Sequence, residues 1–313
     1  MGHELLQVSP LPPFMMNALQ EADYTVHDHT HIKDPGALTK VSAIVGTGAA
    51  KVDRKLLMML PNVKLIAICG VGYDGVDVEA AKEKGIVVTH TPGVLTEDVA
   101  DLAMVLLLSI GRRIPQADRF VRNGDWVDDM FPLTHKVSGA RLGIVGMGRI
   151  GRAIAKRAAA FDMPIAYTGR SPKADVPYPY HASVAALASV VDYLVVAVPG
   201  GAETERLINA EVLQALGPKG YLVNIARGSV VDQPVLVQAL KDKAIAGAAL
   251  DVFWDEPIVD PELRRLPNVV LTPHIASATE ETRRAMVGLT MANLFAFFNQ
   301  QPLPSAVPEC QRG

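Results

Sequence analysis

Four polar side chains follow short apolar runs at positions where a parallel sheet would gather them. Arg227, Asp251 and His274 each come just after such a run, and Glu256 lies five residues beyond Asp251. In a doubly wound fold the carboxyl ends of the strands meet at the ligand crevice. A histidine beside a carboxylate has a raised pKa and can donate a proton near neutral pH. The spacing therefore predicts a shared neighbourhood in which His274 could act as a proton donor.

Each of these residues also has an ordinary structural explanation when it is taken alone. Arg227 could belong to a surface ion pair, Asp251 to a helix cap or turn, and Glu256 to the turn before Pro257. His274 could be a histidine whose hydrogen bonds are satisfied within the fold. Only their joint position behind successive strands of a dinucleotide-binding fold favours the functional interpretation.

The elements that must position these residues are organised around a glycine-rich turn. An apolar run at 142–145 leads into Gly146, Gly148 and Gly151, and helical periodicity follows through residue 158. This order predicts a strand, a tight turn and a helix whose first N–H groups bind a pyrophosphate. The alternative, an ordinary strand-to-helix turn, is disfavoured because the motif has both its strand and its helix.

The next expected strand, 165–168, decides which dinucleotide fits. An acidic residue at its end would bind the ribose 2′-hydroxyl of NAD(H), whereas arginine accommodates the 2′-phosphate of NADP(H). Here the strand is followed by Arg170, Ser171 and Lys173, and Asp162 lies before it on the wrong side. The sequence therefore favours NADP(H), with NAD(H) as the weaker option. In the alternative interpretation Arg170 is a solvated surface charge.

Apolar runs alternate with helical patterns along the whole chain, which predicts an α/β protein with parallel sheets. We expect two Rossmann-like or flavodoxin-like domains, with the active site in the cleft between them. Residues 1–97 plus 286–313 would form a discontinuous substrate-binding domain, because the last helix (279–298) is expected to return to it. Residues 98–285 would form the NAD(P)-binding domain, entered through one long helix from 99 to about 121. The expected strands are 5–8, 24–27, 43–45, 64–69, 86–89, 142–145, 165–168, 193–198, 221–225, 246–250 and 269–271.

Composition limits the possible partners. The chain has 313 residues, of which 49% are hydrophobic, and its formal net charge of −3 gives no basic surface for nucleic acid. The apolar run 99–110 is shorter than the roughly 20 residues that a membrane span needs. Cys69 and Cys310 lack metal-ligand spacing, so we expect no metal and a reducing compartment. With no secretory signal visible, we expect a cytoplasmic protein.

Two further segments have open interpretations. The glycine-rich loop 70–77 follows an apolar run, so its N–H groups could bind a carboxylate, or it is simply a tight turn. Trp126, Met130 and Phe131 lie in a polar, irregular segment, where they could fill a core, form a lid or contact another subunit.

The motifs together resemble the D-isomer-specific 2-hydroxyacid dehydrogenase family over nearly the whole chain. Within that family the chain is most similar to NADPH-dependent glyoxylate/hydroxypyruvate reductases and hydroxyphenylpyruvate reductases, which share its type of strand end at Gly169-Arg170-Ser171. The matching segments are Gly146-Met147-Gly148-Arg149-Ile150-Gly151, Asn224-Ile225-Ala226-Arg227-Gly228, Leu250-Asp251-Val252-Phe253 through Asp255-Glu256-Pro257, Pro273-His274-Ile275-Ala276-Ser277, Val71-Gly72-Tyr73-Asp74 and Thr91-Pro92-Gly93-Val94-Leu95-Thr96.

The resemblance implies NADPH-dependent reduction of small 2-keto acids such as glyoxylate and hydroxypyruvate by a homodimer. It implies that Arg227 binds the substrate carboxylate and polarises the keto oxygen, and that His274, paired with Glu256, protonates that oxygen. Tyr73 stands where relatives often have a smaller aliphatic residue, which bears on the size of the pocket. The resemblance assigns substrate binding to the N–H groups of Val71 and Gly72 beside Tyr73, the nicotinamide carboxamide to Asp251, and the rest of the cofactor to Arg149, Ile150, Pro199, Thr204 and Ile225.

Other functions remain open on the sequence. The protein could be a hydroxyphenylpyruvate reductase or another D-2-hydroxyacid dehydrogenase, such as a formate or phosphoglycerate enzyme. A binding module that senses NADP without catalysis is a different class, and the complete set of Arg227, Glu256 and His274 argues against it.

Overall fold

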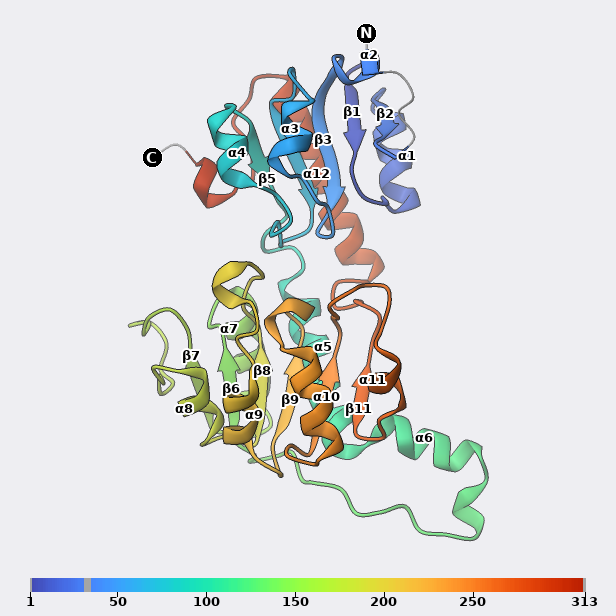
Figure 1. The fold of residues 1–313 in the computed structure, drawn as a ribbon, viewed down its shortest axis with the longest axis vertical. Helices are drawn as coiled ribbons and strands as arrows, with labels where there is room; N and C mark the ends of the chain where they lie inside the picture. Colours follow the sequence, from blue (N-terminus) through green and yellow to red (C-terminus); the bar gives the residue numbers. More distant parts are fainter. Residues whose placement is uncertain (1, 31–34, 312–313) are drawn as a thin grey trace. The chain divides into compact units, whose positions relative to one another are not determined.

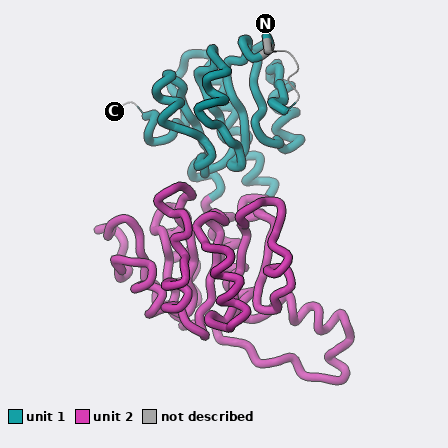
Figure 2. The backbone as a smooth tube through the Cα atoms, in the orientation of Figure 1, with its two compact units in different colours: residues 1–95, 279–313 teal, residues 96–278 magenta. Residues whose placement is uncertain are grey.

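The computed structural model describes residues 2–30 and 35–311. The chain forms two compact units, one made of residues 1–95 and 279–313 and the other of residues 96–278 (Figure 2). Each unit is built on its own parallel sheet, as the sequence predicted.

The first unit has a five-stranded sheet in the order β2-β1-β3-β4-β5, the order of flavodoxin-like folds. Its strands are continuous apolar runs that lie buried between helices, as is typical of parallel sheets. Helix α12 (Glu280–Phe298) packs against β4 (Figure 1). The strands are β1 (Glu4–Gln7), β2 (Thr25–Asp28), β3 (Val41–Thr47), β4 (Leu65–Cys69) and β5 (Val87–Thr89), and the other helices are α1 (Pro13–Glu21), α2 (Pro35–Leu38), α3 (Arg54–Met58), α4 (Val78–Glu83) and the 3₁₀ turn η4 (Pro308–Cys310).

The second unit has six parallel strands in the order β11-β10-β9-β8-β6-β7. A single parallel bridge between Tyr167 and Tyr180 adds one more segment outside β7. With that segment the order becomes 3-2-1-4-5-6-7, which contains the 3-2-1-4-5-6 order of a dinucleotide-binding sheet. The strands are β6 (Leu142–Val145), β7 (Ile165–Thr168), β8 (Tyr193–Val196), β9 (Tyr221–Asn224), β10 (Gly247–Leu250) and β11 (Val269–Leu271), and the helices include α7 (Arg149–Ala159), α8 (Val184–Ala188), α9 (Ala210–Leu216), α10 (Gln233–Lys241) and α11 (Pro261–Arg265).

The prediction of a single helix over 99–121 is wrong. The structure has two helices there, α5 (Thr96–Arg112) and α6 (Ile114–Arg122), with Arg113 between them at φ 53°. Pro115 lies at the start of α6, where its missing N–H costs nothing, whereas inside one long helix it would remove a hydrogen bond. Helix α5 packs against β9, β10 and α7, while α6 and the following residues extend from the second unit as an arm (Figure 1).

The expectations named no helix between the strands 5–8 and 24–27, where the structure has α1. Pro13 is the first residue of that helix, a position that favours proline. In the ranges that the structure describes, no helix has the length and apolar character needed to cross a membrane.

Candidate active site

Three neighbouring strands end level with one another in the second unit. Leu250, the last residue of β10, pairs with Asn224 at the end of β9 and with Leu271 at the end of β11. Because the strands are parallel, the segments that follow them leave the same edge of the sheet. The segments that carry Arg227, Asp251 and His274 therefore begin at adjacent strand ends.

His274 and Glu256 are in direct contact. Nδ1 of His274 lies 2.6 Å from Oε2 of Glu256, and Oε1 of Glu256 accepts a 2.9 Å hydrogen bond from the N–H of Phe253. Burial raises the pKa of Glu256, but the bond and charge of His274, the Phe253 N–H and the charge of Arg227 outweigh it and hold the pKa below its usual value. An ionised Glu256 thus fixes the His274 ring through Nδ1, with Nε2 on the other side of the ring.

The backbone of His274 is held in an uncommon conformation. Its φ is 53°, in the left-handed region that non-glycine residues adopt rarely and that recurs at functional sites. The His274 N–H is oriented toward two carbonyl oxygens, that of Asp251 at 2.9 Å and that of Thr272 at 3.0 Å. This geometry turns the ring toward Glu256 and makes the loop after β11 part of the site.

Asp251 organises that loop. Its side chain is fully buried, and its carboxylate accepts hydrogen bonds from the Thr272 hydroxyl at 2.6 Å and from the N–H groups of Ile275 and Ala276 at 2.9 Å each. Four contacts with residues 272–276, counting the carbonyl bonded by His274, tie the end of β10 to the loop that carries the histidine.

Arg227 lies on a turn shaped by a buried asparagine. Asn224, 1% exposed, accepts from the Ala226 N–H at 3.0 Å and donates to the Arg227 carbonyl at 2.9 Å. The guanidinium is half-buried and donates to the Ala226 carbonyl at 2.9 Å through Nη1. Its charge makes the smallest of the contributions that lower the pKa of Glu256. A cation and the His274–Glu256 pair therefore occupy one neighbourhood, which suits a substrate with a carboxylate and a reducible carbonyl.

The glycine motif forms the cradle that a dinucleotide needs. Gly146 has φ 101°, and a Cβ on Gly151 would lie 2.1 Å from the Gly146 carbonyl oxygen, so a larger residue does not fit either position. Around Gly148, the N-cap of α7, the described structure leaves open space where a Cβ would be. The helix N-terminus is thus accessible to a phosphate group, and the residues present fit a dinucleotide.

The residues expected to select the cofactor lie beside this cradle. Arg170, Ser171 and Lys173 are exposed and follow β7, the neighbour of β6. The Gly146 N–H bonds the Thr168 carbonyl at 3.0 Å, which ties the two strand ends together. At the start of α7, Arg149 is exposed and Ile150 is half-buried. Pro199 and Thr204 follow β8, and the Thr204 hydroxyl donates to the Pro199 carbonyl at 2.7 Å. Ile225 follows β9.

The glycine-rich loop of the first unit follows β4 and is braced from several sides. Thr91 N–H bonds the Gly70 carbonyl at 2.8 Å, and His90 Nδ1 donates to the Val71 carbonyl at 3.0 Å. The carbonyl oxygens of Gly70 and Val71 thus have partners within the unit. Val71 and Gly72 themselves are half-buried rather than enclosed. The loop presents its backbone in a fixed conformation.

The Tyr73 side chain packs against the core of its own unit. Its hydroxyl donates to the Glu309 carboxylate, its ring meets His90 edge to face at 5.3 Å, and it packs on the core beside Cys310. Burial, followed by the bond to Glu309, raises the pKa of Tyr73 to about 12. Neither His90 nor Glu309 was expected at the site, since neither stands in a motif.

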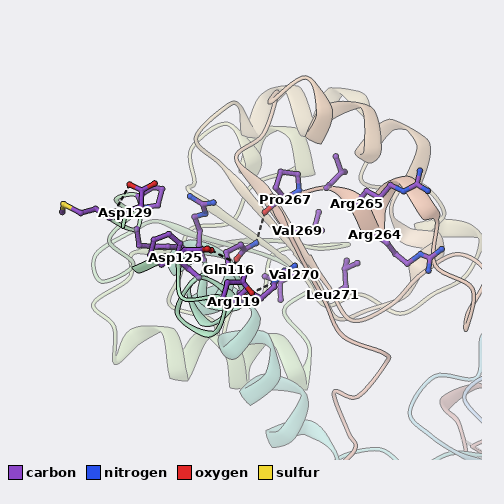
Figure 3. A pocket seen from close by; sticks show the side chains of 18 residues that line it. Gln116, Arg119, Asp125, Asp129, Arg264, Arg265, Pro267, Val269, Val270 and Leu271 are labelled. Carbon is purple, nitrogen blue, oxygen red and sulfur yellow. Dashed lines mark hydrogen bonds between the residues drawn. The ribbon is translucent and has the colours of Figure 1, made fainter. Parts of the chain in front are cut away.

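A separate hollow lies elsewhere in the second unit. It has a volume of about 710 Å³ and is formed by α6, the arm and the α11–β11 region (Figure 3). Its lining includes Arg119, Arg264, Met130 and Phe131, and across it Gln116 Nε2 donates to the Pro267 carbonyl at 2.8 Å. Among the described residues, none that lines it belongs to the candidate active site. Met130 therefore faces this hollow and solvent rather than a core.

The described residues contain no group of three or more histidine, cysteine, aspartate or glutamate side chains that could hold a metal ion. The polar side chains of the site are instead arranged for hydrogen bonding and ion pairing.

Fold and site together define a two-unit dinucleotide-dependent oxidoreductase, and comparison with known proteins specifies the family. Residues 104–276 match the model of the D-isomer specific 2-hydroxyacid dehydrogenase NAD-binding domain. The chain is 50% identical over 267 residues to hydroxyphenylpyruvate reductase of Plectranthus scutellarioides, covering 85% of each chain. It is 45% identical over 307 residues to a glyoxylate/hydroxypyruvate reductase A of Arabidopsis thaliana, covering 97% of this chain and 98% of that one.

A solved structure agrees with these matches. The NADPH-dependent glyoxylate/hydroxypyruvate reductase of Sinorhizobium meliloti, solved with NADP and malonate, superposes with a TM-score of 0.92 at 42% identity and full coverage of both chains. The chain belongs to the D-isomer-specific 2-hydroxyacid dehydrogenase family.

Proposed function

We propose that this protein reduces small 2-keto acids, glyoxylate and hydroxypyruvate among them, to 2-hydroxy acids with NADPH. The observation that carries the proposal is the 2.6 Å contact between His274 and Glu256, with Arg227 close enough to influence the same carboxylate. Relatives named glyoxylate/hydroxypyruvate reductase support the substrate class.

In the proposed reaction Arg227 and the N–H groups of Val71 and Gly72 hold the substrate carboxylate. Arg227 also polarises the keto group, because its charge stabilises the oxygen as negative charge develops there. Bound NADPH would supply the hydride that reaches the carbonyl carbon. His274 transfers a proton from Nε2 to the oxygen, and Glu256 stabilises the ring in the required orientation. The net change is keto acid, NADPH and a proton to hydroxy acid and NADP⁺.

Several residues would hold the cofactor. The N–H groups at the start of α7 meet the pyrophosphate, and the side chains of Arg170, Ser171 and Lys173 meet the 2′-phosphate. The S. meliloti relative solved with NADP supports this preference over NAD(H). Because the Asp251 carboxylate is buried and engaged, we propose that it serves the nicotinamide end mainly by holding the 272–276 loop. Arg149, Ile150, Pro199, Thr204 and Ile225 would lie along the rest of the cofactor.

The same proposal includes a homodimer. Trp126, Val127, Met130 and Leu133 on the arm are 69%, 86%, 85% and 99% exposed, an apolar surface typical of subunit contacts. Asp125 and Asp129 line the hollow together with four arginines, so this face carries charges of both signs and can be complementary to a second copy of itself. A monomeric mass in solution would contradict the dimer.

Free Cys69 and Cys310 are consistent with a reducing compartment, and the cytoplasm is the location we propose.

A substrate panel tests the function. Glyoxylate, hydroxypyruvate and 4-hydroxyphenylpyruvate are each incubated with NADPH or NADH while absorbance at 340 nm is followed. We expect the first two with NADPH to give the highest kcat/KM. A clear preference for 4-hydroxyphenylpyruvate would instead favour the activity named for the 50% identical relative. Cofactor binding without turnover of any keto acid would favour a binding module.

A further inference from the structure

The segment that carries Arg170 starts and ends beside the same residue of β7. The Tyr167 N–H bonds the Pro179 carbonyl at 2.9 Å, and the His181 N–H bonds the Tyr167 carbonyl at 2.8 Å. Residues 179–181 therefore lie along the outer edge of the sheet, and residues 169–178 form a loop closed at its base. The phosphate-selecting side chains all lie on the first half of this loop.

Two tyrosine hydroxyls hold that first half at both ends. The hydroxyl of Tyr167, a residue only 1% exposed, accepts a 2.8 Å hydrogen bond from the Lys173 N–H. The hydroxyl of Tyr180 donates to the Gly169 carbonyl at 3.1 Å. The two rings pack edge to face with centroids 5.4 Å apart, so each tyrosine also fixes the other.

An ion pair ties the second half of the loop to the pyrophosphate-binding helix. Arg152, in the first turn of α7, lies 2.8 Å from Oδ2 of Asp175, and its hydrogen bond lowers the pKa of that carboxyl. Asp175 is 73% exposed, so the pair adds little stability by itself. It does set where the loop lies relative to α7.

We propose that Tyr167 and Tyr180 are positioning residues for the 2′-phosphate of NADP(H), which they serve by fixing the backbone from Gly169 to Lys173. The proposal rests on the cofactor assignment under the proposed function. A backbone that is already ordered lets the side chains of Arg170 and Ser171 bind without first paying the entropy of ordering the loop. The preference for NADP(H) then depends on two hydroxyl groups whose hydrogen bonds are made to the loop backbone.

The test measures the contribution of the 2′-phosphate to binding separately from that of the rest of the nucleotide. Adenosine 2′,5′-bisphosphate and adenosine 5′-monophosphate differ only in that phosphate, and calorimetry gives the Kd of each for wild type, Tyr167→Phe and Tyr180→Phe. Each substitution removes one oxygen and keeps the ring. We expect the Kd for the bisphosphate to rise about three- to tenfold, the effect of one neutral hydrogen bond, with the monophosphate Kd within about twofold. The kcat at saturating NADPH should not change.

Tyr178→Phe is the matched control. Tyr178 lies in the same loop, and within residues 2–30 and 35–311 its hydroxyl has no hydrogen-bond partner, so its removal should leave the ratio of the two Kd values unchanged. Amide hydrogen exchange gives a second readout, because the Lys173 N–H should exchange faster in Tyr167→Phe only. Should that variant fail to fold, Tyr180→Phe tests the other end of the segment.

Two outcomes would overturn the proposal, and they can be told apart. If wild type prefers the bisphosphate and both phenylalanine variants keep that preference, the tyrosines are merely structural while the cofactor assignment stands. If wild type binds both nucleotides equally, the cofactor assignment and the positioning role fail together.

Discussion

The hydroxyl of Tyr73 donates its one proton to the Glu309 carboxylate, whose two oxygens lie 3.0 and 3.2 Å away. This contact joins the loop proposed to bind the substrate carboxylate to the 3₁₀ turn η4 near the end of the chain. It draws the Tyr73 ring onto the core of the first unit.

We expect Glu309→Ala to raise the KM for glyoxylate and hydroxypyruvate about two- to tenfold, because the loop loses one hydrogen bond that orders it. The kcat and the KM for NADPH should stay within about twofold of wild type. Glu309→Gln keeps an acceptor oxygen and should behave nearly as wild type. Glu21→Ala, at the exposed end of α1, controls for loss of a surface charge. An unchanged KM in Glu309→Ala would show that the contact does not order the site.

Glu256→Gln should change how stability depends on pH. The folded protein holds the pKa of Glu256 below its ordinary value of about 4.3. A depressed carboxyl pKa contributes stability above the unfolded pKa, and this is lost as pH falls through the folded pKa. Urea unfolding should show wild type more stable than the variant at pH 7, on the order of 1 kcal/mol or less because the side chain is 32% exposed. The difference should shrink below about pH 4.3; a difference that grows in acid would contradict this sign.

Gly151→Ala should lower the stability of the protein, whereas Gly148→Ala should weaken NADPH binding. The Gly151 Cβ would lie 2.1 Å from a backbone oxygen, so the turn must shift and we expect a loss of about 1–3 kcal/mol in unfolding free energy. Gly148→Ala meets no atom within 4 Å and should keep its stability, yet its methyl group enters the space left for the pyrophosphate. Thermal unfolding and NADPH titration measure the two effects. Tight NADPH binding by Gly148→Ala would argue against the cradle.

Arg170→Asp should raise the KM for NADPH much more than the KM for NADH. The substitution removes a charge-assisted bond to the 2′-phosphate, an effect of about ten- to a hundredfold, and adds a carboxylate that suits a ribose 2′-hydroxyl. Steady-state kinetics with both cofactors at saturating hydroxypyruvate gives the comparison. Equal changes in the two KM values would remove Arg170 from the cofactor site.

The sequence predicted the strands well because buried parallel strands are continuous apolar runs. The boundaries of β6, β7 and β11 agree with the expected residues, and the others differ by one or two residues. The break at Arg113 was missed because the apolar periodicity runs on across it, while one backbone angle and Pro115 end the helix. Such a local exception carries no periodic signal.

Long-range contacts at the site could not be predicted from the sequence. Tyr73 and Glu309 are 236 residues apart, and nothing at either position indicates the other. Tyr180 stands between prolines and charged or polar loop residues. Because no apolar run surrounds it, the sequence did not predict its pairing with Tyr167. The strand ends predicted that His274 and Glu256 share a neighbourhood, and the pairing of the two side chains came from the family resemblance.

The most direct test of the proposed mechanism is the turnover of His274→Ala. Single-turnover and steady-state oxidation of NADPH with hydroxypyruvate should fall by about 10²–10⁴, since no proton donor then stands at the keto oxygen. Circular dichroism and NADPH binding should remain those of wild type. Near-normal turnover by a folded variant that still binds NADPH would contradict the role of His274 as the acid.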